Sequence, residues 1–224
     1  MRSEPKRRIE AKSGISRKST LLLLACLAAF AAQANTIFAE KQPPAATPDA
    51  SGKICLDDVC FDREVVSGGR RIPVRGIGHA TFFTFHLYTA ALYADARHDT
   101  VAEILDASPK RLVIEYRHGF KKDDIVKYSV MQLKANPGVN FDAIRGRFEE
   151  LCAQLQDVKK GDRYEIVYKP EKGTELLFNG TSKIVIPGRD FAKAYFGIWL
   201  SEYPISAGLR RHLLRDIRRE TQAD

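Results

Sequence analysis

Polar side chains that could bind or transform a small molecule are concentrated in one apolar segment, Gly76–Tyr93. They stand among aromatic and β-branched residues and are His79, Thr81, Thr84, His86, Tyr88 and Thr89. An apolar wall with a few spaced polar groups is typical of a pocket for a largely apolar small molecule. A central sheet strand with locally satisfied polar groups fits the same pattern. The segment alone leaves both interpretations open.

The run predicts one long strand, or two strands joined by a kink, with apolar side chains on both faces. His79 and His86 are seven positions apart, an odd spacing that places them on opposite faces of a regular strand. A shared metal ion or a paired acid–base role would therefore need an intervening bulge, and we expect no metal site. Gly76-Ile77-Gly78 lacks the third glycine of a dinucleotide-binding fingerprint. P-loop, nucleophile-elbow and zinc-protease motifs are absent as well, so we expect no cofactor.

Residues 1–34 have the features of a signal peptide. A basic region precedes the apolar run Leu21–Ala32, and Ala32-Gln33-Ala34 provides a small-x-small cleavage site. The run is shorter than the roughly 20 residues needed to span a bilayer. We therefore expect cleavage near Ala34 and a periplasmic or secreted protein. Lipidation at Cys26 and an uncleaved membrane anchor are the less favoured alternatives.

Charge is concentrated at the two ends of the chain. The leader accounts for five of the eight net positive charges, so the mature chain is near +3 and does not suggest a nucleic-acid partner. In the basic tail, Leu209, Leu213 and Ile217 repeat every four residues. This spacing predicts an amphipathic helix over 206–219. Its arginines either face solvent or make a peripheral contact with anionic lipid or an acidic partner.

The cysteines indicate an oxidising compartment. Cys55 and Cys60 flank Leu-Asp-Asp-Val, a separation that fits a disulfide closing a short hairpin loop. Cys152 lies in a helical pattern and is expected to be a buried thiol. No histidine or second cysteine pair stands at zinc spacing, so no structural metal is predicted.

The order of the predicted elements defines the fold class. A spacer over 35–56, rich in Pro, Ala, Ser and Gly in its second half, leads into a folded domain over 57–219. Strands are predicted between 59 and 117, two helices between 123 and 155, strands between 162 and 186, and two helices from 191 to 219. This order predicts an α+β domain, a large antiparallel sheet with helices packed on one face.

Two segments carry a resemblance to a known family. The G-x-G segment running into HLYTAALY, and the block PGRDFAKAYFGIWLSEYPISAGLRRHLL at 187–214, resemble the chalcone isomerase superfamily, especially its bacterial, exported chalcone isomerase-like branch. The similarity covers roughly Val59–Leu214. It implies an open-faced β-sandwich for the domain over 57–219. The superfamily includes plant enzymes that cyclise chalcones to flavanones, non-catalytic helpers and fatty-acid-binding proteins.

The resemblance also shows where the chain departs from the enzymes. Their arginine after the G-x-G pair is replaced by His79-Ala80-Thr81, and Tyr88 and Ile198 stand where they have hydroxyl-bearing threonine or serine. Their tyrosine and asparagine fall near Lys121 and Tyr128. A cation and a hydroxyl are thus missing where that chemistry needs them. Arg71 or Arg75 could in principle supply the cation, although nothing in the sequence requires it.

We therefore predict an exported, non-catalytic protein that binds a fatty acid or a similar apolar ligand. The candidate ligand-binding residues are His79, Phe83, Phe85, His86, Tyr88, Tyr128 and Ile198. One alternative is an isomerase, or intramolecular lyase, acting on a chalcone-like enone. Another is an interaction module that contacts a membrane surface through the basic tail.

Overall fold

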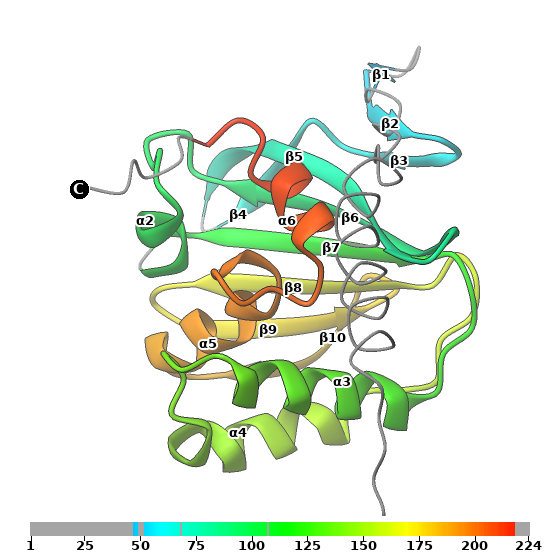
Figure 1. The fold of residues 1–224 in the computed structure, drawn as a ribbon. Coiled ribbons are helices and arrows are strands. Elements are labelled where there is room, and N and C mark those ends of the chain that lie inside the picture. The colour runs from blue at the N-terminus through cyan, green and yellow to red at the C-terminus, as the bar shows by residue number, and fades with distance from the viewer. Residues whose placement is uncertain (1–46, 49–51, 68, 107, 218–224) are drawn as a thin grey trace, which may run out of the picture. The chain divides into compact units, whose positions relative to one another are not determined.

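The computed structural model describes residues 47–48, 52–67, 69–106 and 108–217. Its centre is a seven-stranded antiparallel sheet with the order β10-β9-β8-β7-β6-β5-β4 (Figure 1). Its strands are β4 (Glu64–Ser67), β5 (Arg70–Phe82), β6 (Phe85–Ala94), β7 (Lys110–Tyr116), β8 (Arg163–Lys169), β9 (Gly173–Phe178) and β10 (Thr181–Ile186). Every pairing between neighbours in sequence order is antiparallel, as the order of elements predicted.

The aromatic segment is a hairpin. β5 and β6 pair from Val74↔Tyr93 to Phe82↔Phe85, so the chain reverses at Phe83-Thr84. The register shifts between Ala80 and Thr81, where Leu87 of β6 has no partner on β5. Such a bulge reverses the alternation of side chains along the strand beyond it. Two strands, not one, therefore carry the polar residues of this segment.

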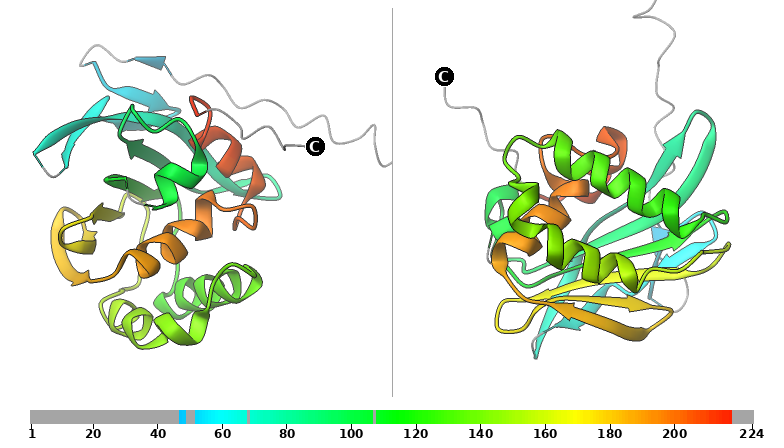
Figure 2. Two further views of the ribbon diagram at one scale, coloured as in Figure 1. Left: turned by 90° about the vertical axis from the view of Figure 1, so that its left-hand side faces the viewer. Right: turned by 90° about the horizontal axis from the view of Figure 1, so that it is seen from below.

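Helices cover one face of the sheet, which confirms the predicted open-faced α+β fold (Figures 1 and 2). They are α2 (Val101–Asp106), α3 (Lys122–Ala135), α4 (Phe141–Ala153), α5 (Arg189–Leu200) and α6 (Ala207–Leu213). In α5, nine of the 12 residues are buried. A helix that is apolar over most of its surface belongs in a core. Of the helices, α5 contributes the most side chains to the main hydrophobic core, which lies between the helices and the sheet.

The two glycines of the G-x-G segment are explained by close packing. A Cβ atom on Gly76 would lie 2.1 Å from the His212 main-chain oxygen of α6, and one on Gly78 would lie 2.6 Å from the His212 Cβ. Only glycine lets the end of α6 approach β5 this closely. The motif therefore allows α6 to pack closely against β5.

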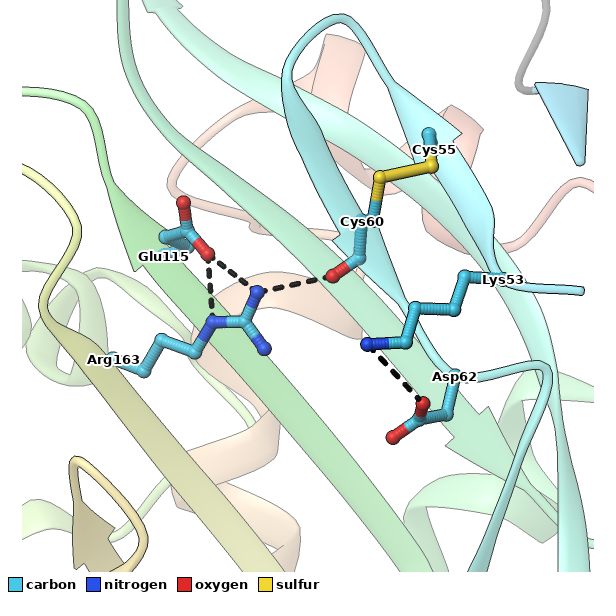
Figure 3. Close-up of a disulfide and its surroundings, with 6 residues drawn as sticks. All are labelled: Lys53, Cys55, Cys60, Asp62, Glu115 and Arg163. Atoms are coloured by element: carbon cyan, nitrogen blue, oxygen red, sulfur yellow. Dashed lines mark hydrogen bonds and ion pairs between the residues drawn. A yellow bond between two sulfur atoms is a disulfide. The ribbon is translucent and has the colours of Figure 1, made fainter. Parts of the chain in front are cut away.

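The other face of the sheet carries a small three-stranded sheet formed by β1 (Thr47–Pro48), β2 (Ile54–Leu56) and β3 (Val59–Phe61). Leu56, Val59 and Phe61 are buried in a second, smaller core with side chains of β5, β6 and β7. The predicted Cys55–Cys60 disulfide is present and crosslinks β2 to β3 (Figure 3). Because β2 lies within 35–56, folded structure begins earlier than the predicted spacer allowed.

The C-terminal helix is shorter than predicted. α6 ends at Leu213, yet Leu209, Leu213 and Ile217 are all buried against the main core, so the apolar periodicity was correct. Cys152 is a buried free thiol, as predicted. Over the residues that the structure describes, no helix has the length and apolar character needed to cross a bilayer. The predicted signal peptide lies outside these residues.

Candidate ligand-binding site

The predicted ligand-binding residues lie on two different faces of the sheet. Tyr88 and Ile198 face the helices and pack in the main core. His79 and His86 lie on the opposite face, beside the β2–β3 hairpin, because both contact Asp57 in its turn. The structure therefore does not bring the predicted set together into one pocket.

Tyr88 uses its hydroxyl group within the protein. The indole Nε1 of Trp199 donates a hydrogen bond of 3.0 Å to Tyr88 Oη. Burial raises the pKa of Tyr88 to about 12, with the Trp199 hydrogen bond acting in the opposite direction. The ring also packs at 5.9 Å from that of Tyr116, and Ile198 is 2 % exposed. A ligand between the sheet and the helices would have to displace these packed side chains.

His79 and His86 stack face to face, with ring centroids 3.9 Å apart and planes 18° apart. The expectation of opposite faces was wrong, because the two residues belong to paired strands and the bulge at Leu87 turns His86 toward His79. The pKa of His79 is lowered to about 4, mainly by burial and secondly by the charge of His86. His79 is therefore a neutral imidazole at neutral pH.

The predicted aromatic residues are exposed. Phe83 is 87 % exposed, Phe85 63 % and Tyr128 52 %. Phe83 occupies the hairpin turn with a φ of 53°, a conformation that is rare for a bulky side chain. Phe83 and Phe85 were expected to line an apolar tail inside a pocket, but the turn carries them to the tip of the β5–β6 hairpin.

A cleft of about 600 Å³ lies instead among α2, the α3–α4 connection and α5, which all stand on one side of the molecule (Figure 2, left). This volume is in the range of small-molecule sites. The apolar part of its lining is formed by Val101, Ala102, Leu105, Val139, Ala143, Ile144, Ala194 and Gly197. The polar part is formed by Asn136, Asn140, Asp190, Lys193, Ser201, Glu202 and Tyr203.

Two of the three charged side chains in this lining, Asp190 and Glu202, have ion-pair partners. Asp190 forms an ion pair with Arg147, and Glu202 pairs with Arg210. The ammonium group of Lys193 forms no ion pair with any residue that the structure describes. A carboxylate entering the cleft would therefore find one cation without an ion-pair partner in an otherwise largely apolar lining, with Asp106 close enough to interact with Lys193 electrostatically.

Sequence reasoning missed this cleft. The sequence predicted Asn136-Pro137-Gly138 as a helix break and Asn140 as a helix cap, with no role in binding. Asn140 does cap α4, because its side-chain oxygen accepts a hydrogen bond from the Ala143 amide. The signal that could have indicated a site is Lys193, a cation that interrupts the buried run from Phe191 to Leu200 in α5. Its neighbours on α2 and α4 are distant in sequence, so no local pattern connects them.

The arginines considered for enone chemistry are engaged elsewhere. Arg75 is buried, and its guanidinium donates to the main-chain oxygens of Asp95 (3.2 Å) and Asp216 (3.1 Å). Arg71 lies 3.5 Å from Glu64 on the neighbouring edge strand. Neither guanidinium group is directed by these contacts toward the cleft or toward Tyr88.

A curled antiparallel sheet with helices on one face is the fold of chalcone isomerase-like proteins. This chain belongs to the chalcone isomerase-like family, whose model matches residues 55–215. Among solved structures, it is similar to a fatty-acid binding protein of Arabidopsis thaliana, with a TM-score of 0.55 and 11% sequence identity. The match covers 76% of this chain and 96% of that one, and at this identity it shows a shared fold. None of the curated protein sequences matches the chain.

Proposed function

We propose that this protein binds a fatty acid, or a similar apolar carboxylate, without transforming it, and that the ligand occupies the cleft beside Lys193. The unpaired ammonium group above an apolar lining is the observation that carries this proposal. The apolar side chains would take the hydrocarbon chain, and Lys193 would take the carboxylate. The similarity to a fatty-acid binding protein supports the same class of ligand.

Binding of a saturated fatty acid series by the delipidated mature protein tests this proposal. We expect Lys193→Met to weaken palmitate binding about tenfold, because an ion-assisted hydrogen bond contributes about 1.5 kcal/mol or more. Binding of hexadecanol, which lacks the carboxylate, should not change. Ala143→Trp should weaken both ligands, since Ala143 is exposed in the cleft and a large ring there would fill it.

Lys160→Met is the matched control, because Lys160 is an exposed lysine outside the cleft lining. It should leave both affinities unchanged. Equal palmitate affinity in the wild type and in both cleft variants would show that the cleft is not the site. Absence of any fatty acid from protein purified from its host, together with no binding in vitro, would reject the class of ligand.

The location that supports this function is outside the cytosol. We infer export with cleavage near Ala34, because the leader has the order of a signal peptide and a disulfide persists in an oxidising compartment. N-terminal sequencing of the protein from the host's soluble extracytoplasmic fraction should begin at Asn35. Recovery of the intact leader in the membrane fraction would favour an anchor instead.

A further inference from the structure

Three side chains with metal-binding atoms converge on the face of the sheet that carries no helices. They are Asp57 in the β2–β3 turn, His79 of β5 and His86 of β6. Their ligand atoms all lie within 4.8 Å of one another, and within the described part of the chain no other group of three does so. His79 and His86 stand on the two strands of one hairpin, and Asp57 comes from a separate hairpin, so the fold brings the third side chain to the pair.

The distances suit a shared ion. Asp57 Oδ2 lies 3.0 Å from His79 Nε2 and 3.7 Å from His86 Nδ1. Neighbouring ligand atoms around one zinc ion are roughly 3.3 to 3.6 Å apart, given metal–ligand bonds of about 2.0 to 2.2 Å. The observed separations bracket this range. A bound ion must lie near the plane of each imidazole ring, so the His86 ring would have to rotate out of its stack with His79. The His86 side chain is 40% exposed, which leaves it free to rotate on its solvent-facing side.

His79 is a buried residue with one nitrogen lacking a hydrogen bond. Its side chain is 3% exposed, and Nε2 makes no hydrogen bond of good geometry, although Asp57 Oδ2 lies 3.0 Å away. An unpaired buried polar atom is costly, and a plain Asp57–His79 hydrogen bond does not account for it. A metal ion between the three groups would use the Nε2 lone pair.

The second nitrogen of His79 has the partner that metal-binding histidines require. Nδ1 lies 3.0 Å from Thr89 Oγ1, and Thr89 is fully buried. If Nδ1 carries the proton and donates to this hydroxyl oxygen, Nε2 is left as a bare lone pair. Such outer contacts orient the ring and set its tautomer in known metal sites.

The Asp57 carboxylate is held in place by the hairpin that carries it. The Cys55–Cys60 disulfide closes the two strands next to the turn, and Arg163 donates 3.0 Å to the Cys60 carbonyl oxygen (Figure 3). Asp57 itself has a φ of 54°, which aspartate tolerates better than most residues. Arg117, whose charge acts on His79, forms an ion pair with Asp58, which offsets its repulsion of a bound metal ion.

We propose that Asp57, His79 and His86 bind a divalent transition-metal ion, with Zn²⁺ as the ion of choice. Two imidazoles and one carboxylate favour zinc, copper or nickel over magnesium or calcium. Asp57 and His86 are both about two-fifths exposed, so water or an external ligand can complete the coordination. The cysteines of the hairpin are consumed by the disulfide and take no part.

Calorimetric titration of Zn²⁺ into the untagged, chelator-treated mature protein tests this site. We expect one Zn²⁺ per chain, with binding weakened more than tenfold by His86→Ala and by Asp57→Asn. Both substitutions are at exposed positions, and thermal melts of the metal-free variants report whether they fold. His98→Ala, which changes a histidine outside the cluster, is the matched control and should bind as the wild type does.

Thr89→Val tests the positioning role of Thr89. Loss of an outer hydrogen bond lowers metal affinity roughly 10- to 100-fold in comparable sites. Electron paramagnetic resonance of the Cu²⁺-loaded wild type should show coupling to two imidazole nitrogens, and to one in His86→Ala. No stoichiometric Zn²⁺ binding, or binding that His86→Ala leaves unchanged, would overturn the proposal. The readout is metal alone, so its outcome is independent of fatty-acid binding.

Discussion

The two faces of the central sheet use the same strands in opposite ways. On β7, Lys110 points into the helix-covered core, where its ammonium group contacts the Leu105 and Ser108 carbonyl oxygens and the rings of Tyr168 and Phe196. Its neighbour Arg111 points to the other face and pairs with Glu165 of β8. The helix-covered face therefore surrounds its buried cation with main-chain oxygens and aromatic rings. The outer face keeps its charged side chains in ion pairs and partly accessible to solvent.

This difference separates two kinds of role. The helix-covered core is large and closely packed, so its polar groups, such as the Tyr88 hydroxyl, are used to hold the structure together. The outer core is small, and charged side chains surround it, including the 2.6 Å contact between Arg163 and Glu115. The side-chain atoms of Asp57, His79 and His86 that could coordinate a metal ion lie on the outer face.

The largest effect should come from disturbing the contact between α6 and the sheet. Gly76→Ala would force a Cβ against the main chain of His212 and Leu213, and we expect a loss of about 3 kcal/mol in the free energy of unfolding. Gly146→Ala is the control, since this glycine lies within α4 with no atom within 4 Å of an added Cβ. It should raise stability by about 0.5 to 1 kcal/mol. Urea denaturation measures both, and equal effects would disprove the close approach.

A pH effect of roughly 2 kcal/mol should arise from Lys110. Burial lowers its pKa from 10.5 to about 7 in the folded protein, so the unfolded chain binds more protons between these values. Wild-type stability should therefore rise with pH above about 7, by at most about 1.4 kcal/mol per unit from this group. Lys110→Met should lack that rise between about pH 7 and 8.5 in urea denaturation. The exposed Lys172→Met is the control, and the same rise in Lys110→Met as in the wild type would contradict the assignment.

The smallest of the three effects concerns the outer face alone. Replacing Cys55 and Cys60 by serine removes a crosslink between residues separated by five positions, which is expected to cost about 1 to 2 kcal/mol. Zn²⁺ affinity should also fall, because the turn that orients Asp57 is less constrained. Fatty-acid affinity should be unchanged, since the cleft lies among the helices. A parallel loss of both affinities would mean that the two faces are not independent.

Much of the fold could be predicted from the sequence because its signals are local. The spacing of Ile144, Phe148 and Leu151 by four and three positions predicted α4, and Asn179-Gly180 predicted the β9–β10 turn. The cysteine separation predicted the disulfide correctly. The length of α6 could not be predicted, since Ile217 continues the apolar period although the helix has ended at Leu213.

By itself, the sequence determined the fold class, the disulfide and the family, because each depends on residue order and on short-range spacing. Only the tertiary structure decided where the chemistry lies. A reversal at Phe83-Thr84 and a bulge at Leu87 put His79 against His86, and a distant hairpin brings Asp57 to them. Lys193 likewise becomes a candidate anchor only when α2 and the α3–α4 connection close around it. Side-chain convergence is a property of packing between distant segments, and no periodicity within one segment encodes it.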